Sequence, residues 1–408
     1  MNTTTVMAWR NIWRNPRRTI LTMLAIAFGA ALLVFSVGFQ LGQYDLMISN
    51  SVRVYQGLLQ VQREGYQEEP KLRTSIENAI EVAKQVRDSS SFAGVSTRAN
   101  GFALLSSEQR TYGVAITGVE PNHEKQVSTI PGLVKQGRYL DQITANELVI
   151  GASLAKNMRL KLGDEVTLLG TGRDGSVAAA ILPVVGIFES GSRDLDRSLV
   201  QIPLQTFQEI FAMGTHAHSI VIFDERIDQV ALFQQHISSL LPNEGLTTLR
   251  WDQVQPGLKE MIELDYSSGW FTYFILVAII TFSIMNTFLM AVLERTREFG
   301  IMLALGFKPF SIGKMLIIEA FFLTLIALLF GTALGLAVNT YFYFYGLSIE
   351  GMEEMAAMFN MPSVITPQIS LKSITMGPLV ILGFTLLAAL YPALKIRRLE
   401  PVEAMRHV

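Results

Sequence analysis

Four long stretches of the chain contain no charged residue. Each exceeds the about 20 apolar residues with which a helix crosses the hydrocarbon core of a bilayer. A buried core helix is the alternative for any one of them, but four in one chain favour membrane spans. The sequence therefore predicts four transmembrane helices, within the uncharged stretches 19–44, 266–293, 320–349 and 373–394.

The first stretch also has features of a cleaved signal peptide. Four arginines precede it, at positions 10, 14, 17 and 18, and Ala25-Ile26-Ala27 resembles a cleavage site. However, the apolar run continues to Phe39, whereas a cleavage site follows the apolar region. An uncleaved membrane anchor therefore fits better.

The long segment between the first two spans combines strand-like and helix-like patterns. A capping-box spacing at 74–77, followed by apolar residues at helical intervals to Val86, predicts an amphipathic helix, and a second helix is predicted over 230–240. Short strands are predicted at 101–105, 112–118, 147–150, 165–169, 181–188 and 220–223. We therefore expect a large α+β domain between the first and second spans.

Helical periodicity continues beyond the spans on both sides of this domain. Tyr44, Met47, Ile48 and Val52 follow the first span without Gly or Pro until Gly57, and positions 258, 261, 262 and 265 precede the second in the same way. A continuous helix from Thr19 to Val52 would be roughly 50 Å long, beyond the ~30 Å hydrocarbon core. We therefore expect helical stalks that join the spans to the domain.

Basic residues in the short connections predict the orientation. The N-terminal segment has four arginines and no acid before Asp45, the 294–314 connection has basic residues at 295, 297, 308 and 314, and the tail after Lys395 is basic as well. These segments are predicted to be cytoplasmic. The inserted domain and the acidic connection between the third and fourth spans are then extracytoplasmic, and both termini are cytoplasmic.

The resulting fold class is a multi-pass α-helical membrane protein with four transmembrane helices and a large α+β extracytoplasmic domain inserted between helices 1 and 2. The predicted segments are a cytoplasmic interfacial amphipathic helix (1–18), transmembrane helix 1 (19–40), the α+β domain with its stalks (41–266), transmembrane helix 2 (267–293), a cytoplasmic helix and loop (294–313), transmembrane helix 3 (314–346), an extracytoplasmic loop (347–373), transmembrane helix 4 (374–394) and a cytoplasmic tail (395–408).

Composition narrows the function classes. Half of the 408 residues are hydrophobic and only 17% are charged, which agrees with a membrane protein. The net charge of −2 excludes a nucleic-acid binder that depends on bulk basicity. Because the chain has no cysteine, disulfide scaffolds and metal sites built on thiolates are excluded too.

Two glycine-containing segments resemble nucleotide-binding motifs, but neither fits. Residues 170–175 read Gly-Thr-Gly-Arg-Asp-Gly, but the segment that follows is strand-like and contains Pro183, whereas a dinucleotide-binding loop needs a helix there. A glycine-rich hairpin is the better interpretation. The run from Gly306 to Lys314 is too long for a phosphate loop, and Met315 stands where Ser or Thr is required. We therefore predict that the chain has no ATPase site.

His216 and His218 form a candidate metal-binding pair. Their i, i+2 spacing would place both rings on one face of a strand, but no cysteine or evident third ligand lies nearby. Surface histidines are the better interpretation. Since no catalytic triad or paired-carboxylate spacing stands out either, we predict no catalytic and no metal site.

The N-terminal segment predicts a helix along the membrane surface. In a helical projection, one side of this segment carries the apolar residues Val6, Trp9, Ile12 and Trp13. Another side carries Arg10, Arg14 and Arg18. We expect Trp9, Arg10, Trp13 and Arg14 to form a membrane-interface anchor, with Trp at headgroup depth and Arg at the phosphates. Anchoring alone and a further role in partner binding are both open.

Glu319 lies at the start of the third span and is its only acid. A carboxylate within a membrane is costly and usually paired or functional. Because Glu319 lies only five residues beyond Lys314, helix packing near the interface is the simpler interpretation, and a coupling role is the alternative.

The segment between the second and third spans carries the most specific motif. Residues 294–300 read Glu-Arg-Thr-Arg-Glu-Phe-Gly, and an apolar run follows to Gly306, which indicates a short helix ended by glycine. This segment resembles the cytoplasmic coupling helix of FtsX/MacB/LolC-type ABC transporter permeases. Further similarity to that family lies at 8–18, 317–320, 391–393 and 400–406, and in the inserted domain at 147–164 and 201–206.

The resemblance implies a non-catalytic, free-standing permease subunit of an ATP-driven transporter in the bacterial cytoplasmic (inner) membrane. Its partners would be two ABC ATPase subunits, which bind ATP and Mg, and a second permease in a homo- or heterodimer, while this chain binds no cofactor. The family converts ATP hydrolysis into motion of its outer domains. The residues implied for ATPase coupling are Arg295, Thr296, Arg297, Glu298, Phe299 and Gly300.

Members of this family differ in task. MacB-like pumps carry a fused ATPase domain, for which this chain has no room, and FtsX proper has a smaller outer domain and regulates cell-wall hydrolases. The lipoprotein-releasing LolC/LolE type matches best in layout. We therefore expect extraction of lipoprotein or lipid from the outer leaflet first, export of a small amphipathic compound with a periplasmic adaptor second, and transmembrane signalling third.

The stalks are the candidate site for substrate contact. A lipid-bearing substrate that leaves the leaflet sideways needs an apolar surface continuous with the bilayer. Packing of the two stalks against each other is the alternative explanation of the same residues. The candidates are Phe39, Tyr44, Met47 and Ile48 on the first helix and Ile262, Tyr266 and Trp270 on the second.

Overall fold

The computed structural model describes residues 3–89, 92–241, 245–348 and 364–396. It divides into two compact units, a helical unit (Met1–Asp45, Ile262–Ser348 and Val364–Val408) and an inserted domain whose main part is Leu46–Met261. The predicted cytoplasmic tail and most of the loop at 347–373, including its three glutamates, lie outside the described residues.

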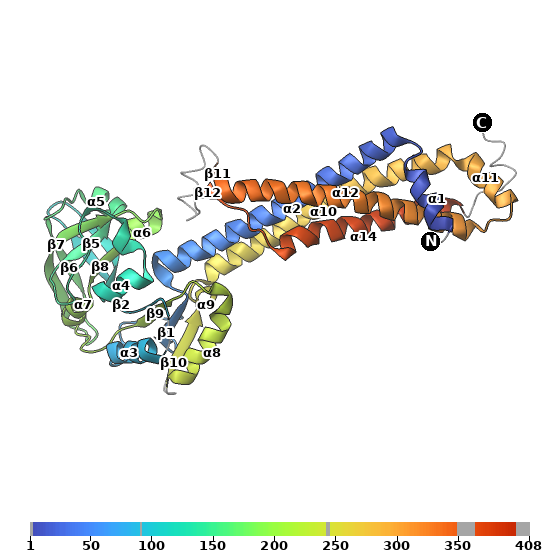
Figure 1. Ribbon diagram of the computed structural model, residues 1–408. Coiled ribbons are helices and arrows are strands. Elements are labelled where there is room, and N and C mark those ends of the chain that lie inside the picture. Colours follow the sequence, from blue (N-terminus) through green and yellow to red (C-terminus); the bar gives the residue numbers. More distant parts are fainter. Residues whose placement is uncertain (1–2, 90–91, 242–244, 349–363, 397–408) are drawn as a thin grey trace. The chain divides into compact units, whose positions relative to one another are not determined.

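Among the residues that the structure describes, the helical unit contains four helices that are long and apolar enough to cross a membrane. Figure 1 shows them with the shorter elements of this unit. The elements are α1 (Thr3–Ile12), α2 (Pro16–Ser51), α10 (Pro256–Glu294), α11 (Thr296–Ala304), α12 (Pro309–Tyr345), β11 (Leu347–Ser348), β12 (Val364–Ile365) and α14 (Leu371–Lys395). The prediction of four transmembrane helices is therefore confirmed.

Small residues let α12 pack closely against α2. A Cβ atom added to Gly335 would lie 2.8 Å from the carbonyl oxygen of Ala31 and 2.9 Å from Cβ of Val34. Gly331, one turn earlier, would place a Cβ 2.8 Å from that of Ala30. This Gly-x-x-x-Gly spacing lets two backbones approach where no hydrophobic effect drives helices together. The amide of Asn339 then donates to the buried Val34 carbonyl at 3.0 Å.

The first long helix differs from its prediction at its start and agrees with it at its end. The expected single helix through residue 18 is interrupted, because α1 ends at Ile12 and α2 begins at Pro16. Proline lacks the N–H of a continuing helix and disfavours helical geometry in the residue before it. At the other end α2 reaches Ser51, and a π-helical turn, Val52–Gln56, follows and ends at Gly57 with φ of +73°.

The described part of the inserted domain has ten strands and several short helices. Its strands are β1 (Leu59–Arg63), β2 (Gly94–Ser106), β3 (Thr111–Val119), β4 (Val134–Gly137), β5 (Leu148–Gly151), β6 (Glu165–Thr171), β7 (Val177–Phe188), β8 (Leu199–Pro203), β9 (Ser219–Phe223) and β10 (Leu246–Arg250). Its α-helices are α3 (Ala79–Ser89), α4 (Pro121–Val127), α5 (Ala152–Met158), α6 (Arg193–Ser198), α7 (Leu204–Ile210), α8 (Val230–Leu240) and α9 (Trp251–Val254). Two 3₁₀ turns are Ile130–Leu133 and Ile227–Gln229.

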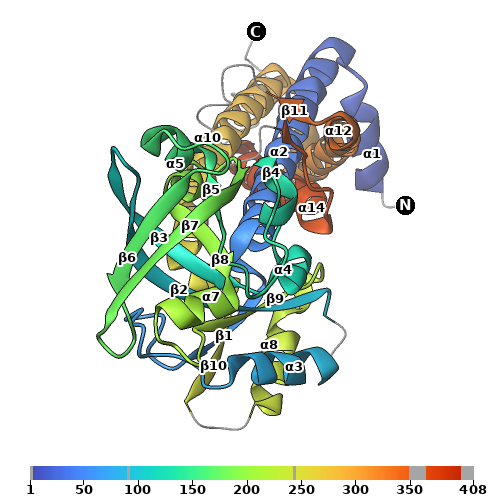
Figure 2. The same ribbon diagram turned by 90° about the vertical axis from the view of Figure 1, so that its left-hand side faces the viewer.

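The strands form a closed barrel that continues into a smaller sheet (Figure 2). The barrel order is β2-β3-β8-β5-β7-β6, and β6 pairs back with β2. The smaller sheet has the order β10-β1-β9-β2, so the 13-residue strand β2 belongs to both. Helices α3 and α8 pack on the smaller sheet. The mixed α+β class is confirmed, including all six predicted strands and the helix over 230–240.

The segment Gly170–Gly175 is a hairpin connection, as predicted. Strands β6 and β7 pair antiparallel up to Thr171 and Val177. The amide of Gly172 donates to the Ser176 carbonyl at 2.8 Å, and Gly175 has φ of +91°, which favours glycine. The strand that follows excludes the helix that a dinucleotide-binding loop requires.

The amphipathic helix predicted after the capping box is present as α3, but it begins only at Ala79, because Ile76 pairs with Ala217 and Asn78 has φ of +49°. The prediction for one of the two histidines is wrong. His218 is not a surface residue: its ring is fully buried and stacks on Tyr66 with centroids 5.1 Å apart. The backbone N–H of Asn100 donates to its Nδ1 at 2.9 Å, so the side chain completes the core beside β9.

Candidate functional site

Helix α11 is a nine-residue segment between the second and third long helices. Helix α10 ends at Glu294, Arg295 leaves helical geometry, and the hydroxyl of Thr296 donates to the Leu293 carbonyl at 2.8 Å. After Leu305 the chain turns at Gly306, whose φ is +90°. The predicted glycine-ended helix is therefore present, with its first residue at Thr296.

One face of α11 is packed into the helical unit. Phe299 is completely buried in a cluster that includes Val292, Ile312 and Met315. Gly300 is buried as well. The guanidinium of Arg295 lies 5.2 Å from the centroid of the Phe299 ring. Burial of a phenylalanine side chain stabilises a fold by about 1.5–3 kcal/mol, so this face fixes how α11 is seated.

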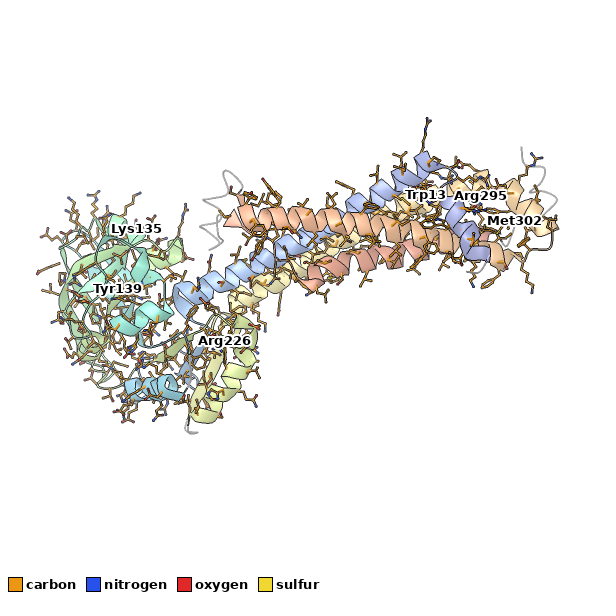
Figure 3. All side chains as sticks on the ribbon, viewed as in Figure 1. Trp13, Lys135, Tyr139, Arg226, Arg295 and Met302 are labelled. Atoms are coloured by element: carbon orange, nitrogen blue, oxygen red, sulfur yellow. The ribbon has the colours of Figure 1, made fainter. Side chains whose placement is uncertain are left out.

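The same face carries a chain of ion pairs. Glu298 accepts from both terminal nitrogens of Arg14, at 2.8 Å for Nη1–Oε2, and from Nε of Arg295 at 3.3 Å. Nη1 of Arg295 also donates to Oε2 of Glu319 in α12 at 3.3 Å. In a parallel contact Arg18 of α2 donates to Glu294 of α10 at 2.5 Å. Figure 3 labels Trp13, Arg295 and Met302 at the end of the helical unit that holds α1 and α11.

The charge state of Glu298 agrees with these contacts. The hydrogen bond from Arg14 lowers the pKa of Glu298 below its ordinary value, and Arg295 lowers it further, against a smaller opposing effect of burial. The hydrogen bond to Glu298 in turn raises the pKa of Arg14. Both groups are therefore charged at neutral pH, and their contact is a charge-assisted bidentate pair.

The opposite face of α11 is open. Arg297, Ile301 and Leu305 follow one another at helical i, i+4 spacing and are all exposed. Phe307, just beyond Gly306, is exposed as well. Within the part of the chain that the structure describes, Arg297 forms no ion pair. Of the implied coupling residues, Arg297 thus remains available for contact with a partner, whereas Arg295 and Glu298 are engaged within the chain.

The N-terminal anchor residues lie on and after α1. Ala8 and Ile12 are the buried positions, and the ring of Trp9 packs edge-on against Phe322 of α12 at 5.8 Å. Trp9 and Trp13 remain about half exposed, as a role at the membrane interface requires. Arg10 is exposed too, whereas Arg14 lies in the turn after α1 and contacts Glu298.

The stalk candidates are divided between the two units. In the helical unit Tyr44 is buried: its hydroxyl donates to Asp265 at 2.6 Å and accepts from Gln40 at 2.7 Å. The hydroxyl of Tyr273 donates to Gln40 at 2.8 Å. This polar network joins α2 to α10, so packing explains the position of Tyr44.

The remaining stalk candidates have mixed surroundings. Tyr266 packs edge-on against Trp270 and lies under the ammonium of Lys372, and Trp270 is 42% exposed. Phe39 stacks on Phe35, and Ile262 is half-buried. In the inserted domain Ile48 packs against the main core, and Met47 lines a pocket of about 480 Å³. Within the helical unit, Tyr266 and Trp270 therefore lie together, whereas Phe39 and Tyr44 have other packing partners.

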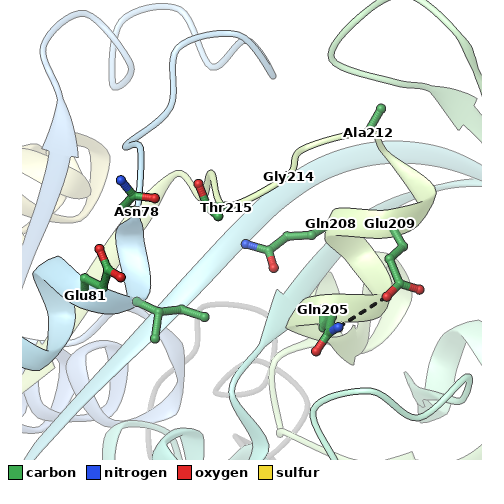
Figure 4. A pocket seen from close by; sticks show the side chains of 9 residues that line it. Asn78, Glu81, Gln205, Gln208, Glu209, Ala212, Gly214 and Thr215 are labelled. Atoms are coloured by element: carbon green, nitrogen blue, oxygen red, sulfur yellow. Dashed lines mark hydrogen bonds between the residues drawn. The ribbon is translucent and has the colours of Figure 1, made fainter.

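A pocket of about 640 Å³ lies in the inserted domain between α3 and α7 (Figure 4). Its lining includes two carboxylates, Glu81 and Glu209, and the amide of Gln205 donates to Glu209 at 3.4 Å. Asn78 and Ala212, also in the lining, have positive φ. Among the described residues no group of three His, Cys, Asp or Glu side chains is arranged to hold a metal ion.

Sequence reasoning missed the two polar networks of the helical unit. Gln40 and Tyr44 have i, i+4 spacing, and Asp265 and Tyr273 have i, i+8 spacing, which are the only local signals for the first. Arg14 and Glu298 are separated by 284 positions, so no spacing pattern links them.

The chain has the layout of a membrane permease subunit. It has four helices that can cross a membrane, a mixed α/β domain inserted after the first, and a short helix between the second and third. Two family models match the chain: the MacB-like periplasmic core domain over residues 19–235, more than half of the chain, and the FtsX-like permease C-terminal region over 270–401. The chain belongs to this family of ABC transporter permeases.

Named relatives fall into two groups. LolC of Neisseria meningitidis, a lipoprotein-releasing system transmembrane protein, is 21% identical over 75% of this chain and 76% of its own length. LolE of Haemophilus influenzae is 21% identical over 99% of both chains. The macrolide export ATP-binding/permease protein MacB of Pectobacterium atrosepticum is 25% identical over 95% of this chain but only 58% of its own length.

Solved structures are similar to about half of this chain. The periplasmic region of MacB from Actinobacillus actinomycetemcomitans is 17% identical, covers 49% of this chain and 92% of its own, and has a TM-score of 0.35. The extracellular domain of the transporter YknZ is 13% identical and covers 47% of this chain and 99% of its own, with a TM-score of 0.36.

Proposed function

We propose that this permease subunit receives motion from separate ABC ATPase subunits through α11 and uses it to extract lipoprotein or lipid from the outer leaflet of the bacterial inner membrane. The proposed contact with the ATPase rests on the two different faces of α11. Phe299 and Arg295 hold one face, while Arg297, Ile301 and Leu305 present an exposed apolar face with a positive charge. Such a rigidly seated face suits docking into a cleft of a partner.

The ATPase partners bind ATP and Mg, and this chain binds neither. The absence of a phosphate-loop spacing and the hairpin at 170–175 support this division of labour. The purified chain should hydrolyse no ATP, and hydrolysis should appear only when an ATPase subunit is added. Turnover by the chain alone would contradict the proposal.

The docking face can be tested by substitution. Arg297→Glu and Ile301→Asp should each reduce co-purification of the ATPase subunit. The first reverses the positive charge of the exposed face, and the second places a carboxylate in its apolar part. Lys135→Glu, an exposed charge reversal on β4 of the inserted domain, is the matched control. Normal ATPase binding by both α11 variants would refute the assignment of this face.

Relatives named LolC and LolE cover three quarters to nearly all of this chain and support lipoprotein release as its task. A relative named as a macrolide exporter also covers 95% of it, so export of a small amphipathic compound with a periplasmic adaptor is the second candidate. Mass spectrometry of material that co-purifies in mild detergent separates them. Acylated lipoproteins support extraction, whereas an adaptor supports export and a cell-wall hydrolase supports signalling.

The stalk residues serve to locate the substrate path. Photocrosslinkers at the half-exposed Trp270 and at Met47, which lines a pocket, should form adducts with acylated material if substrate passes there. Tyr44, which is buried in its hydrogen-bond network, should crosslink only to permease helices. Adducts with permease alone at all three positions would exclude this path.

A further inference from the structure

The N-terminal segment contacts the coupling helix directly. Arg14 lies in the short turn between α1 and α2, and its guanidinium forms two hydrogen bonds with the carboxylate of Glu298 in α11. Four residues later, Arg18 in the first turn of α2 contacts Glu294 at the end of α10. The beginning of the first long helix is therefore attached to both sides of the connection that contains α11.

The contact extends into the membrane-facing part of the unit. Arg295 is shared between Glu298 at 3.3 Å and Glu319 of α12 at 3.3 Å. The side chain of Arg295 is 11% exposed and that of Glu319 is 8% exposed, whereas Arg14 is 54% exposed. The series Arg14, Glu298, Arg295, Glu319 thus runs from solvent to a nearly buried carboxylate.

The charges of this cluster are balanced. Arg14, Arg18 and Arg295 contribute three positive charges, and Glu294, Glu298 and Glu319 contribute three negative ones. Removal of one partner leaves an uncompensated charge, and the penalty is largest at the buried end. Arg17, by contrast, is exposed and forms no ion pair with the residues that the structure describes.

We propose that Arg14 is a positioning residue for ATP-driven coupling: its pair with Glu298 fastens α11 to the start of α2, so that movement of α11 reaches the first span directly as well as α10 and α12. This inference rests on the coupling role proposed above for α11. Since α2 leads along the chain into the inserted domain, the pair gives the coupling helix a second mechanical connection to that domain.

The test is a charge swap in the full chain, reconstituted in lipid nanodiscs with its ATPase subunits. Arg14→Glu and Glu298→Arg should each lower the ATP hydrolysis rate of the complex about tenfold, which corresponds to about 1.4 kcal/mol. The amount of bound ATPase should stay unchanged, because the exposed face of Arg297 and Ile301 is not altered. The double variant, which restores an opposite-charge pair, should recover most of the rate.

Arg17→Glu is the matched control, since it makes the same charge change three residues away without removing an ion pair. The ATP hydrolysis rate of the complex with this variant should equal that of the wild type. If both single reversals couple normally, or if the double variant is no better than either, the inference is refuted. If the wild-type chain binds no ATPase subunit or supports no hydrolysis, the proposed function itself fails, which is a different result.

A second variant addresses misfolding of the charge reversals. The chain has no cysteine, so Arg14→Cys combined with Glu298→Cys provides a unique thiol pair. Without a linker this variant should lose coupling, and a short bis-maleimide that joins positions 14 and 298 should restore it. Equal hydrolysis rates before and after cross-linking would contradict a positioning role for this contact.

Discussion

Arg98 and Glu124 form a completely buried ion pair in the inserted domain. The guanidinium of Arg98 donates to the carboxylate of Glu124 at 2.6 and 3.1 Å, and the hydroxyl of Ser96 donates to the same carboxylate at 3.0 Å. The ring of Tyr55 lies 4.3 Å from the guanidinium carbon. Since every charge has a close partner, the pair tolerates burial, but neither member can be lost without leaving the other uncompensated.

Glu124→Gln should therefore destabilise this domain strongly. Loss of one partner of a buried pair costs about 3–5 kcal/mol, and hydrogen-exchange protection of the β2 amides in the purified full chain would report it. Glu225→Gln is the control, because Glu225 pairs with Arg53 at an exposed site and should cost less than about 1 kcal/mol. Equal protection in the two variants would contradict the buried pair.

His218 should make the stability of the inserted domain sensitive to acid. Burial lowers the pKa of His218 from its usual 6.5 to about 4. Between these pH values the unfolded chain binds a proton that the folded domain does not, so stability falls as the pH is lowered from 6.5 towards 4, by about 3 kcal/mol in all.

Urea unfolding at several pH values checks this dependence. His218→Gln should flatten the loss between pH 6.5 and 4, since glutamine does not titrate. An unchanged slope in the His218 variant would assign the acid sensitivity to other groups.

At the level of elements, the contact between α2 and α12 depends on Gly335. Its Cβ position is occupied by backbone and by the β-branched Val34, neither of which can move away locally. Gly335→Leu should therefore separate the helices and destabilise the helical unit by about 1–3 kcal/mol or more, as for an overpacked core. A thermal-shift assay in detergent measures this.

Gly383 supplies the control for that substitution. It is an exposed glycine in α14 with nothing within 4 Å of its Cβ position. Gly383→Leu should leave the melting temperature almost unchanged. If the two leucine variants have the same melting temperature, close backbone approach at Gly335 does not determine how α2 and α12 pack.

The sequence predicts those elements whose pattern is local. Uncharged runs predict the four long helices, and short strand-like segments between turn residues predict six of the strands. Strand β1 was missed because it contains Gln60 and Gln62, polar residues that are buried inside the domain, where the amide of Gln62 donates to Gln60 at 2.8 Å and the amide of Gln60 donates to the Gln56 carbonyl at 2.7 Å. Strand β10 likewise carries Thr248, which is buried in the folded domain.

The same distinction holds for the candidate site. A charged-then-apolar segment ended by glycine is enough to place α11, because capping and periodicity are local. The pairing of Arg14 with Glu298 depends instead on how α1, α2 and α11 meet after folding. Local pattern therefore predicted the helix α11 but not which of its charges are used within the chain.

For the whole molecule, the contacts of Arg14 and Arg18 constrain the membrane topology. They place the N-terminal segment and α11 at the same end of the helical unit, so both must lie on one side of the membrane. The excess of basic residues in these segments predicts that side to be cytoplasmic. Because α2 crosses once between Arg18 and the inserted domain, the domain is expected on the opposite side.

Single cysteines in this naturally cysteine-free chain test the topology directly. Gly132→Cys in the inserted domain should react with a membrane-impermeant maleimide in intact spheroplasts. Arg17→Cys and Ser311→Cys, both exposed, should react only after the membrane is permeabilised, because they lie at the ends of α2 and α12 that are predicted to be cytoplasmic. Labelling of position 17 or 311 in intact spheroplasts would show that the predicted orientation is wrong. It would also refute the proposal that ATPase subunits reach α11 from the cytoplasm.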